Sequence, residues 1–414
     1  MIEPSVERVD VGIVGGGPAG LATAAALARV GAGRVVVLER EVEPGGIPRH
    51  AKHQGFGLRD LHRSFSGPRY AERCLELAEA AGADIRPSSQ VTGWSTNGAL
   101  EVTSPLGRER VEARAVVLAT GCRERPRAAR LVPGSRPQGV LTTGALQQLV
   151  YLQQERPGRR AVVVGAEHVS FSALLTLSHG SARAIAMVTE HPRHQTLAAF
   201  RAGAMLRFRT PLFTRTALTR IRGRTRVEEV ELTNLDTGAT RRLACDLVVF
   251  TADWIPDHEL AVLAGAALDP GTRGPAVDAS FRTTRDGLFA TGNVLHDAET
   301  ADVAALSGRA TAESVVRYLE GEPWPASRVH IECEAPLAWI APNVITPTAA
   351  TDHPTFRLRA REFVDSRQLE ISQGGQPLWR GRVKRLMPGR SASLPGEWAP
   401  DVDSEFGPIV ISLA

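Results

Sequence analysis

The chain has 414 residues, and its 43% hydrophobic and 23% charged residues are typical of a globular protein rather than a disordered or fibrous one. Its 49 basic residues barely outnumber its 45 acidic residues, and no lysine- and arginine-rich block suggests a nucleic acid partner. The length favours about two to four domains.

The positions of the cysteines and of the apolar residues exclude several kinds of site and segment. The four cysteines, Cys74, Cys122, Cys245 and Cys333, lie far apart. No two of them form a C-x-x-C pair, which excludes a dithiol redox centre of that type. Their spacing also does not match that of zinc or iron–sulfur ligands, so we predict no metal site. No early segment has the layout of a signal peptide, and no apolar stretch approaches the ~20 residues that span a bilayer. We therefore expect a cytoplasmic protein with no membrane span.

The strongest motif lies in the segment Val9–Glu39. An apolar run predicts a buried strand, Gly15–Gly20 fits G-x-G-x-x-G, and small helix formers follow over residues 22–28. Arg34–Leu38 predicts a second strand, which ends at Glu39. A strand, a glycine turn, a helix and a terminal acid in this order indicate a dinucleotide-binding βαβ unit rather than an unrelated glycine-rich turn.

Each of these residues has a physical role. Gly15 permits the tight turn, Gly17 lets the backbone approach a pyrophosphate, and Gly20 lets the helix lie close to the sheet. The N-terminus of that helix offers free N–H groups and a positive dipole end to the phosphates. A carboxylate at Glu39 is placed to accept both hydroxyls of an adenosine ribose.

The segment 40–67 is rich in histidine, arginine and glycine and has no clear periodicity, so we expect a loop with one helical turn at most. In a dinucleotide-binding fold this part of the chain runs along the ligand toward its reactive end. Candidates to line the reactive face are therefore His50, His53, Gln54, Phe56, Arg59 and His62. The alternative, that these residues decorate a surface loop, stays open.

The next elements follow from periodicity and turn residues. We predict a helix over 69–81 with Gly82 at its end, a β-meander at 90–94, 100–104 and 108–112, and a buried strand from Ala115 to a Thr120-Gly121 turn. A proline- and glycine-rich linker over 132–140 leads into a helix over 143–154.

A second strand-turn-helix pattern begins at Ala161 and reaches a strand over 184–188. Gly165 occupies the first glycine position, but the other two hold Glu167 and Ser170. A side chain at the second position blocks the approach of the backbone to a pyrophosphate, and a carboxylate there repels phosphate. We expect a nucleotide-binding fold that has lost or changed its nucleotide, so NAD(P)H is a doubtful cofactor.

Strands over 226–233 and 241–250 complete this second fold. A strand over 288–294 then carries Thr291-Gly292-Asn293, and a helix over 301–320 follows it. The remainder, 328–414, alternates in short stretches and contains no convincing helix, which indicates a small all-β domain. Its predicted strands are 329–333, 356–359, 369–372, 378–383 and 409–413.

The first βαβ unit, the Thr120-Gly121 turn, the inserted second fold and the returning Thr291-Gly292-Asn293 together resemble the flavoproteins with two dinucleotide-binding domains, such as thioredoxin reductase and glutathione reductase. The resemblance implies an α/β fold with two Rossmann-like domains, one inserted in the other, plus the small C-terminal all-β domain. The expected parts are residues 1–130 and 247–322 for the FAD-binding domain, 131–246 for the second nucleotide-binding-like domain, and 323–414 for the β domain.

The same resemblance implies that the first fold binds the ADP half of FAD, with the glycines at the pyrophosphate and Glu39 at the ribose. The third residue of the returning turn is usually Asp, bonded to the ribityl chain, and here it is Asn293. The following helix would direct its N-terminus at the N1–C2=O edge of the flavin. The residues expected to hold FAD are Gly15, Gly17, Pro18, Ala19, Gly20, Glu39, Arg40, Gly46, Thr120, Gly121, Gly292, Asn293 and Ala301.

A narrower likeness lies in the stretches GGIPRH, ATGCRERPR, TADWIPDHEL and TGNVLHDAETAD, which are similar to the FAD subunits of hydrogen cyanide synthase, opine oxidase, dye-linked proline dehydrogenase and sarcosine oxidase. It implies oxidation of a small amine, amino acid or imine by hydride transfer to flavin, alone or within a complex. Those subunits often carry a cysteine cluster for an iron–sulfur centre, which this chain lacks. A homo-oligomer and a complex with a partner oxidoreductase both stay open, beside the small-molecule substrate.

A neutral histidine near the flavin suits proton removal at neutral pH, and the catalytic candidates are His50, His53 and His296. The carboxylates of Asp297, Glu299 and Asp302 either bind a cationic substrate or act as favourable charges at a helix N-terminus. Two other functions stay open. One is an NAD(P)H-dependent flavin reductase, and the other is a flavin-containing partner or scaffold subunit with little activity alone.

Overall fold

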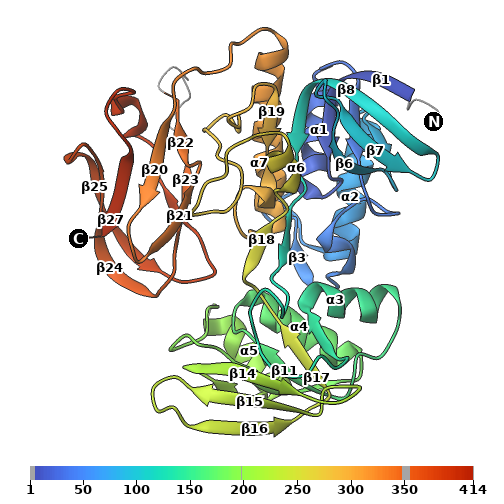
Figure 1. Ribbon diagram of the computed structural model, residues 1–414, viewed down its shortest axis with the longest axis vertical. Coiled ribbons are helices and arrows are strands. Elements are labelled where there is room, and N and C mark those ends of the chain that lie inside the picture. Colours follow the sequence, from blue (N-terminus) through green and yellow to red (C-terminus); the bar gives the residue numbers. More distant parts are fainter. Residues whose placement is uncertain (1–4, 197, 347–354, 414) are drawn as a thin grey trace. The chain divides into compact units, whose positions relative to one another are not determined.

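A computed structural model describes residues 5–196, 198–346 and 355–413 (Figure 1). The chain forms two compact units. The first comprises Met1–Arg49, Gln54–Cys122 and Ile255–Ala414, and the second comprises His50–His53 and Arg123–Trp254. Short strands β9 (Cys122–Glu124) and β18 (Trp254–Pro256) lie where the chain passes between the units.

The first unit contains a sheet with strand order β5-β2-β1-β8-β7-β6, in which β19 also pairs with β8. Strands β5, β2, β1, β8 and β19 run parallel, and most of their apolar residues are buried, as expected for a sheet covered on both faces. The strands are β1 Ser5–Val14, β2 Val35–Leu38, β5 Asp84–Arg86, β6 Gln90–Trp94, β7 Leu100–Ser104, β8 Gly107–Leu118 and β19 Leu288–Ala290.

Strand β8 corrects one prediction. The sequence indicated two strands, 108–112 and 115–118, but the structure has a single one. No glycine or proline lies between residues 108 and 118 to end the first strand. Instead, β1 pairs along both halves, while the first half also pairs with β7 and the second with β19.

The main helices of this unit are α1 (Pro18–Arg29), α2 (Gly67–Ala80) and α7 (Ala301–Leu319). Helix α7 lies so close to α1 that a Cβ at Gly308 would collide with the carbonyl of Ala19. The Thr23 hydroxyl donates to the Gly308 carbonyl at 2.9 Å. This packing places the first half of α7 beside the start of α1. Shorter elements are η1 Ile47–His50, β3 Gln54–Phe56, β4 Phe65–Ser66, α6 Glu259–Leu263 and η3 Gly292–Val294.

The second unit has a parallel sheet with strand order β10-β17-β11-β12-β13 and a separate antiparallel sheet, β14-β15-β16. Its strands are β10 Val140–Thr142, β11 Arg160–Val164, β12 Arg183–Val188, β13 Leu212–Phe213, β14 Thr216–Arg222, β15 Glu229–Asn234, β16 Thr240–Ala244 and β17 Leu247–Phe250. Its helices are α3 Thr143–Gln147, a π-helical turn Gln148–Leu152, α4 His168–His179 and α5 Ala198–Phe208.

The predicted strand 241–250 is wrong as a single element, because β16 and β17 belong to different sheets. The chain changes sheet at Asp246, whose carboxylate accepts the N–H of Arg160 at 2.7 Å and of Arg159 at 3.0 Å. These bonds start β17 beside β11. A continuous apolar pattern does not reveal such a switch.

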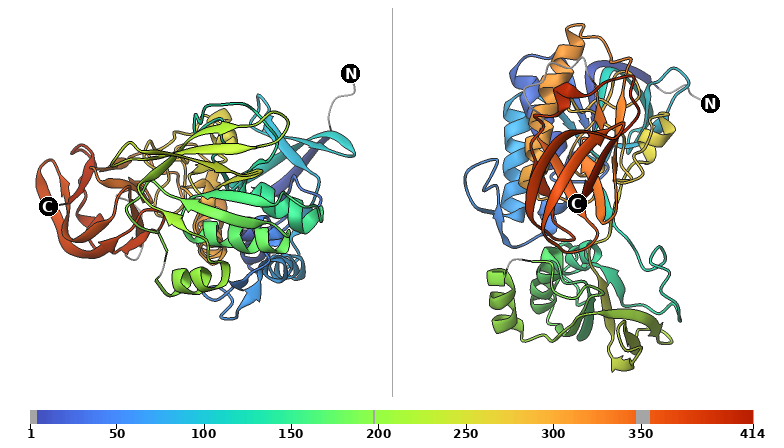
Figure 2. Two further views of the ribbon diagram at one scale, coloured as in Figure 1. Left: turned by 90° about the horizontal axis from the view of Figure 1, so that it is seen from below. Right: turned by 90° about the vertical axis from the view of Figure 1, so that its left-hand side faces the viewer.

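The C-terminal β domain, residues 329–413, has a five-stranded sheet β22-β20-β27-β24-β25 and a three-stranded sheet β21-β23-β26 (Figure 2). Its described part contains no α-helix, only a 3-10 turn at Ala399–Asp401, which confirms the predicted all-β domain. Phe356 and Trp398 stack in its core, with ring centroids 4.8 Å apart. The strands are β20 Val329–Cys333, β21 Leu337–Ala341, β22 Val344–Ile345, β23 Phe356–Ala360, β24 Val364–Gln373, β25 Gln376–Leu386, β26 Ala392–Leu394 and β27 Ile409–Leu413.

Candidate functional site

The glycine turn after β1 has the geometry that its motif requires. Gly15 has φ +107°, and a Cβ there would lie 2.5 Å from the Ala119 carbonyl oxygen. At Gly20 a Cβ would collide with the carbonyl of Gly15. At Gly17, in contrast, no described residue beyond its neighbours in the chain and its own helix has an atom within 4 Å of where a Cβ would be. The turn is therefore tight at its two ends and open in the middle, where a pyrophosphate would approach the backbone.

The N-terminus of α1 is free to bind an anion. Gly17 is its N-cap, Pro18 stands in its first turn, and Ala19 and Gly20 follow as buried residues. Among the described residues no side chain caps this end, and its first turn contains no acid. The N–H groups and the dipole of α1 therefore remain available to phosphate.

Glu39, at the end of β2, supports the same turn. Its side chain is only 6% exposed, and its carboxylate accepts the N–H of Gly16 at 2.7 Å and the N–H of Glu41 at 2.8 Å. Gly45 donates to the Gly16 carbonyl at 2.7 Å, and Gly46 lies against Gly17. Because an ionised carboxylate has about four lone-pair sites, Glu39 can also accept ribose hydroxyls.

Two more of the predicted cofactor positions lie at the end of β8. The Thr120 hydroxyl donates to the Asp257 carbonyl at 2.7 Å, and the Asp257 N–H donates to the Gly121 carbonyl at 2.9 Å. Arg40 is largely exposed and lies 3.8 Å from the Asp257 carboxylate. All of these residues belong to the first unit and lie near the carboxyl ends of its parallel strands, where open α/β sheets bind ligands.

The returning turn at Gly292–Asn293 joins β19 to α7. A Cβ at Gly292 would lie 2.6 Å from the Cβ of Ala19, so only glycine allows this turn to contact the start of α1. Ser307 of α7 accepts the Gly292 N–H at 3.1 Å and the Thr291 hydroxyl at 3.2 Å. Ala301 opens α7, and none of the described side chains caps this helix. Its first-turn N–H groups are thus available to a ligand.

Asn293 bonds at both ends of its amide to one residue. Its Oδ1 accepts the Glu299 N–H at 3.1 Å, and its Nδ2 donates to the Glu299 carbonyl at 3.3 Å. A carboxylate accepts but does not donate, so only the amide satisfies both groups. This explains why Asn suits a position at which the resemblance described above implies Asp. With these two bonds made to the described chain, the amide has one lone pair and one N–H left over for a ligand.

His296 is buried, with 5% of its surface exposed. Its ring stacks on Trp339 with centroids 4.9 Å apart, and its Nδ1 lies 2.6 Å from the Asp297 carbonyl. Burial lowers the pKa of His296 below its usual value, which the neighbouring carboxylates only partly offset. The imidazole is therefore neutral at neutral pH, with Nε2 as its acceptor when Nδ1 donates to the carbonyl.

The carboxylates near His296 are committed to protein contacts. Arg359 lies 2.6 Å from Asp297 and 3.0 Å from Glu299. Burial raises the pKa of Asp297 despite that charge. At Glu299 burial is also the largest single effect, but Arg359, Ser391 and other neighbours together outweigh it and lower the pKa. Asp302 accepts the N–H groups of Gly57 and Arg59 at 2.7 and 3.0 Å. These contacts favour the structural alternative for all three acids over binding of a cationic substrate.

His50 and His53 lie in the second unit. His50 is buried, and its Nδ1 lies 3.3 Å from the Gln147 side-chain oxygen. His53 is half-buried, and its N–H donates to the Ala51 carbonyl at 2.8 Å. The catalytic roles of His50, His53 and His296 stay predictions.

The corresponding turn of the second unit is closed by the chain itself. Glu167 is 7% exposed, and its carboxylate accepts the Ala166 N–H at 2.9 Å and the Ser170 hydroxyl at 2.7 Å. Ser170 in turn accepts the Glu167 N–H, which completes a capping box at the start of α4. Gln195 donates to the Ala166 carbonyl at 2.9 Å, so a second segment lies on this turn. A carboxylate thus occupies the helix end that phosphate would need.

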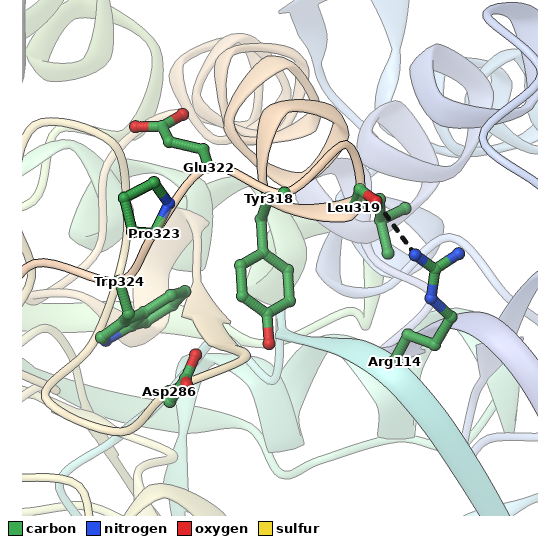
Figure 3. Close-up of a pocket in the computed structure, with 8 residues that line it drawn as sticks. Arg114, Asp286, Tyr318, Leu319, Glu322, Pro323 and Trp324 are labelled. Atoms are coloured by element: carbon green, nitrogen blue, oxygen red, sulfur yellow. Dashed lines mark hydrogen bonds between the residues drawn. The ribbon is translucent and has the colours of Figure 1, made fainter.

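A hollow of about 350 Å³ lies elsewhere in the first unit (Figure 3). It is lined by Arg114, Asp286, Tyr318 and Trp324, among others, and Arg114 donates to the Leu319 carbonyl at 2.9 Å. It lies at the carboxyl end of α7 and just before β19, away from the strand ends that carry the glycine turns. It is therefore not part of the predicted cofactor site.

The sequence profile of the pyridine nucleotide-disulphide oxidoreductase family matches residues 9–308. The chain belongs to this family. A thioredoxin reductase of Treponema pallidum (strain Nichols) is 29% identical over 318 residues, which cover 75% of this chain and 97% of that protein. The crystal structure of the T. acidophilum thioredoxin reductase superposes with a TM-score of 0.63 at 22% identity, covering 75% of this chain and 98% of that one. An opine oxidase component from Rhizobium meliloti is 37% identical over 133 residues, 29% of this chain and 24% of that protein.

Membership of the pyridine nucleotide-disulphide oxidoreductase family confirms the predicted α/β fold and makes the chain an FAD-dependent oxidoreductase. Its four cysteines include no C-x-x-C pair, and Cys74 and Cys245 are buried. No cluster of three or more metal-ligating side chains occurs in the part of the chain that the structure describes, and no described helix is long and apolar enough to cross a membrane.

Sequence reasoning missed three residues that shape the site. Ser307 and Thr23 are small hydroxyl residues within helices, and neither carries a motif. Arg359 lies 60 residues beyond Glu299 in the sequence, and no local pattern links a β-strand arginine to a turn so far away. Only the folded arrangement identifies these residues.

We predict that Gly17→Glu abolishes FAD retention without unfolding the chain. The space around Gly17 accepts a side chain, but a carboxylate there would repel the pyrophosphate. The check is the flavin absorbance per chain after purification, with apoprotein melting temperature as the fold control. Gly203→Glu in the exposed helix α5 adds the same charge at another open glycine and should purify yellow. An equally yellow Gly17→Glu protein contradicts the assignment.

We predict that Asn293→Asp lowers the free energy of unfolding by about 1–2 kcal/mol, because a carboxylate leaves the Glu299 carbonyl without its donor. Chemical denaturation of the apoproteins measures the change. Asn234→Asp is the matched control, since the Asn234 oxygen accepts three bonds in an exposed turn and a carboxylate keeps all of them. Equal stability of the two variants would show that the Asn293 amide contributes nothing.

Proposed function

We propose that this FAD-dependent oxidoreductase takes its electrons from a small amine, amino acid or imine rather than from NAD(P)H. The observation that carries the proposal is the second glycine turn, where Glu167 occupies the end of α4 with its own carboxylate. Bound FAD would supply a two-electron acceptor for hydride. The protein then has to hold the donor and remove its proton.

The electrostatics of the second turn disfavour a dinucleotide. A nicotinamide dinucleotide would have to displace a carboxylate that makes two hydrogen bonds and replace it with phosphates of the same sign of charge. Gln195 bonds to the same turn, so the backbone that would receive the pyrophosphate is covered as well. Opening the site therefore requires breaking several buried hydrogen bonds, each costly to leave unmade.

The stretch that resembles the opine oxidase component supports an amine-type donor. The fold similarity to thioredoxin reductases does not decide the donor, because this chain has no C-x-x-C dithiol to pass electrons to. A cytoplasmic location and a partner oxidoreductase, or a second copy of the chain, belong to the same proposal.

Different residues of the predicted site would bind different parts of FAD. The turn Gly15–Gly20 would hold the pyrophosphate, Glu39 the ribose, and Asn293 with the start of α7 the flavin side. His50, His53 and His296 remain candidates for proton removal, and His296 is held in the neutral form that a base needs.

The test is anaerobic titration of the purified holoprotein with NADH, with NADPH, and with a panel of amines and amino acids. We expect the flavin band to survive both nicotinamides and to bleach with a member of the panel. Dithionite must bleach the band fully, which shows that the flavin is reducible. Rapid bleaching by NADPH would overturn the proposal and make the chain an NAD(P)H-dependent flavin reductase. Bleaching by dithionite alone would favour a partner or scaffold role.

A variant tests the role of Glu167 directly. Glu167→Ala removes the cap of α4, and we expect it to lower the free energy of unfolding by about 1–2 kcal/mol. Glu190→Ala, an exposed glutamate in the same unit, should change stability by less than about 0.5 kcal/mol. Thermal or chemical unfolding of both variants gives the comparison. If Glu167→Ala is stable and NADPH reduces its flavin, the Glu167 side chain lies at a nucleotide-binding site.

A further inference from the structure

We propose that the C-terminal β domain clamps the flavin end of the FAD site through Arg359, which acts as a positioning residue. The inference rests on the proposed location of the flavin beside Asn293. It assigns to this domain a role that its sequence does not indicate. The contacts that carry it all lie within the first unit.

Arg359, in β23, inserts into the loop between the returning turn and α7. It is 5% exposed, and its guanidinium lies 2.6 Å from the Asp297 carboxylate and 3.0 Å from the Glu299 carboxylate. It also donates to the Ala298 carbonyl at 3.2 Å. One side chain of the β domain therefore holds three consecutive residues of this loop.

Trp339, in β21, reinforces the same contact. Its ring stacks on the His296 imidazole with an interplanar angle of 2°, and the Arg359 guanidinium lies 5.0 Å from its centroid. Stacking on a buried aromatic ring fixes the plane of the imidazole at the start of the loop. Both ends of the segment His296–Glu299 are thus held by the β domain.

The clamp reaches the predicted flavin site in one further step. Glu299, which Arg359 holds by its side chain, uses its backbone N–H and carbonyl to bond both ends of the Asn293 amide. The orientation of Asn293 therefore depends on where Glu299 lies. Just beyond Glu299 the chain enters α7, whose first turn would face the flavin.

A second contact fixes the β domain to the same unit. Asn343 accepts the Val277 N–H at 2.8 Å through its side chain, and Thr346 donates to the buried Asp278 carboxylate at 3.3 Å. Asp278 in turn pairs with Arg282 at 2.8 Å. Because these residues lie before β19 and the Arg359 contact lies after it, the β domain holds both sides of the returning turn.

Loss of Arg359 would remove the closest cation from two half-buried carboxylates and leave Glu299 with Arg357, whose guanidinium lies 3.9 Å away. Such a loop would move toward solvent to hydrate its charges. The Asn293 amide would then lose its fixed orientation, which alters the oxidised and the reduced cofactor unequally because they differ in charge.

The test compares Arg359→Met with wild type as full chains. FAD affinity is measured by fluorescence on adding FAD to apoprotein, and the flavin midpoint potential by stepwise dithionite reduction against a reference dye. We expect FAD to bind about tenfold or more weakly. We also expect a change of up to tenfold in the ratio of affinities for reduced and oxidised FAD, which for two electrons is about 30 mV. Neither measurement uses a substrate, so failure of the proposed donor class leaves the test intact.

Two controls separate positioning from general damage. Arg380→Met removes an arginine from an exposed pair on β25 and should leave both quantities unchanged. Arg359→Lys keeps the charge but not the planar fork, so it should give intermediate values. If Arg359→Met fails to fold, the triple variant Asp297→Asn/Glu299→Gln/Arg359→Met replaces it, because it leaves no carboxylate at these two positions without its cation. A folded variant, single or triple, with wild-type affinity and potential overturns the proposal.

Discussion

The two glycine turns of the chain differ in the anion that meets the N-terminus of the following helix, and the cofactor site depends on this difference. Helices α1 and α4 follow the first strands of two βαβ units built alike, and each offers N–H groups at a sharp glycine turn. At α1 the middle glycine leaves open space, and no described side chain fills it. At α4 the same position is Glu167, which supplies the anion from the chain itself. One residue type therefore separates a turn that can receive phosphate from a turn that has no need of it.

Close approach of backbone segments to one another determines the rest of the cofactor site in the first unit. Gly292 and Gly308 let the returning turn and α7 come within contact of Ala19, at the start of α1. Larger residues at either position would push α7 away and separate two halves of the cofactor site that lie far apart in the sequence. Since Ser307 then holds the turn by hydrogen bonds, the close packing also fixes its backbone. Packing of small residues thus brings these two halves of the site together.

What could be predicted from the sequence was local. The fingerprint Gly15–Gly20 with Glu39 and the eroded second turn each follow from residues within a single βαβ unit, and helix α7 follows from its own small and apolar residues. The long strand β8 and the change of sheet at Asp246 were not predictable, because a partner strand decides where a strand ends. Nor was the pairing of Arg359 with Glu299, since a buried ion pair across domains leaves no mark in either segment. The histidines of the 50–53 segment remain as the sequence left them, candidates whose role the fold does not decide.

The family name joins a pyridine nucleotide to a disulphide, and this chain departs from that pattern in two places. Its cysteines include no C-x-x-C pair, and its second turn is capped from within. These changes are physically independent, because one removes a reactive pair and the other fills an anion site. What the chain keeps is the first fold, and what it adds is a β domain whose charged contact falls on the turn carrying Asn293. An added domain that acts only as a cap has no need to bury an arginine with two carboxylates at that place. Burying them costs desolvation, and that cost is easier to understand if the position of the loop matters to the cofactor.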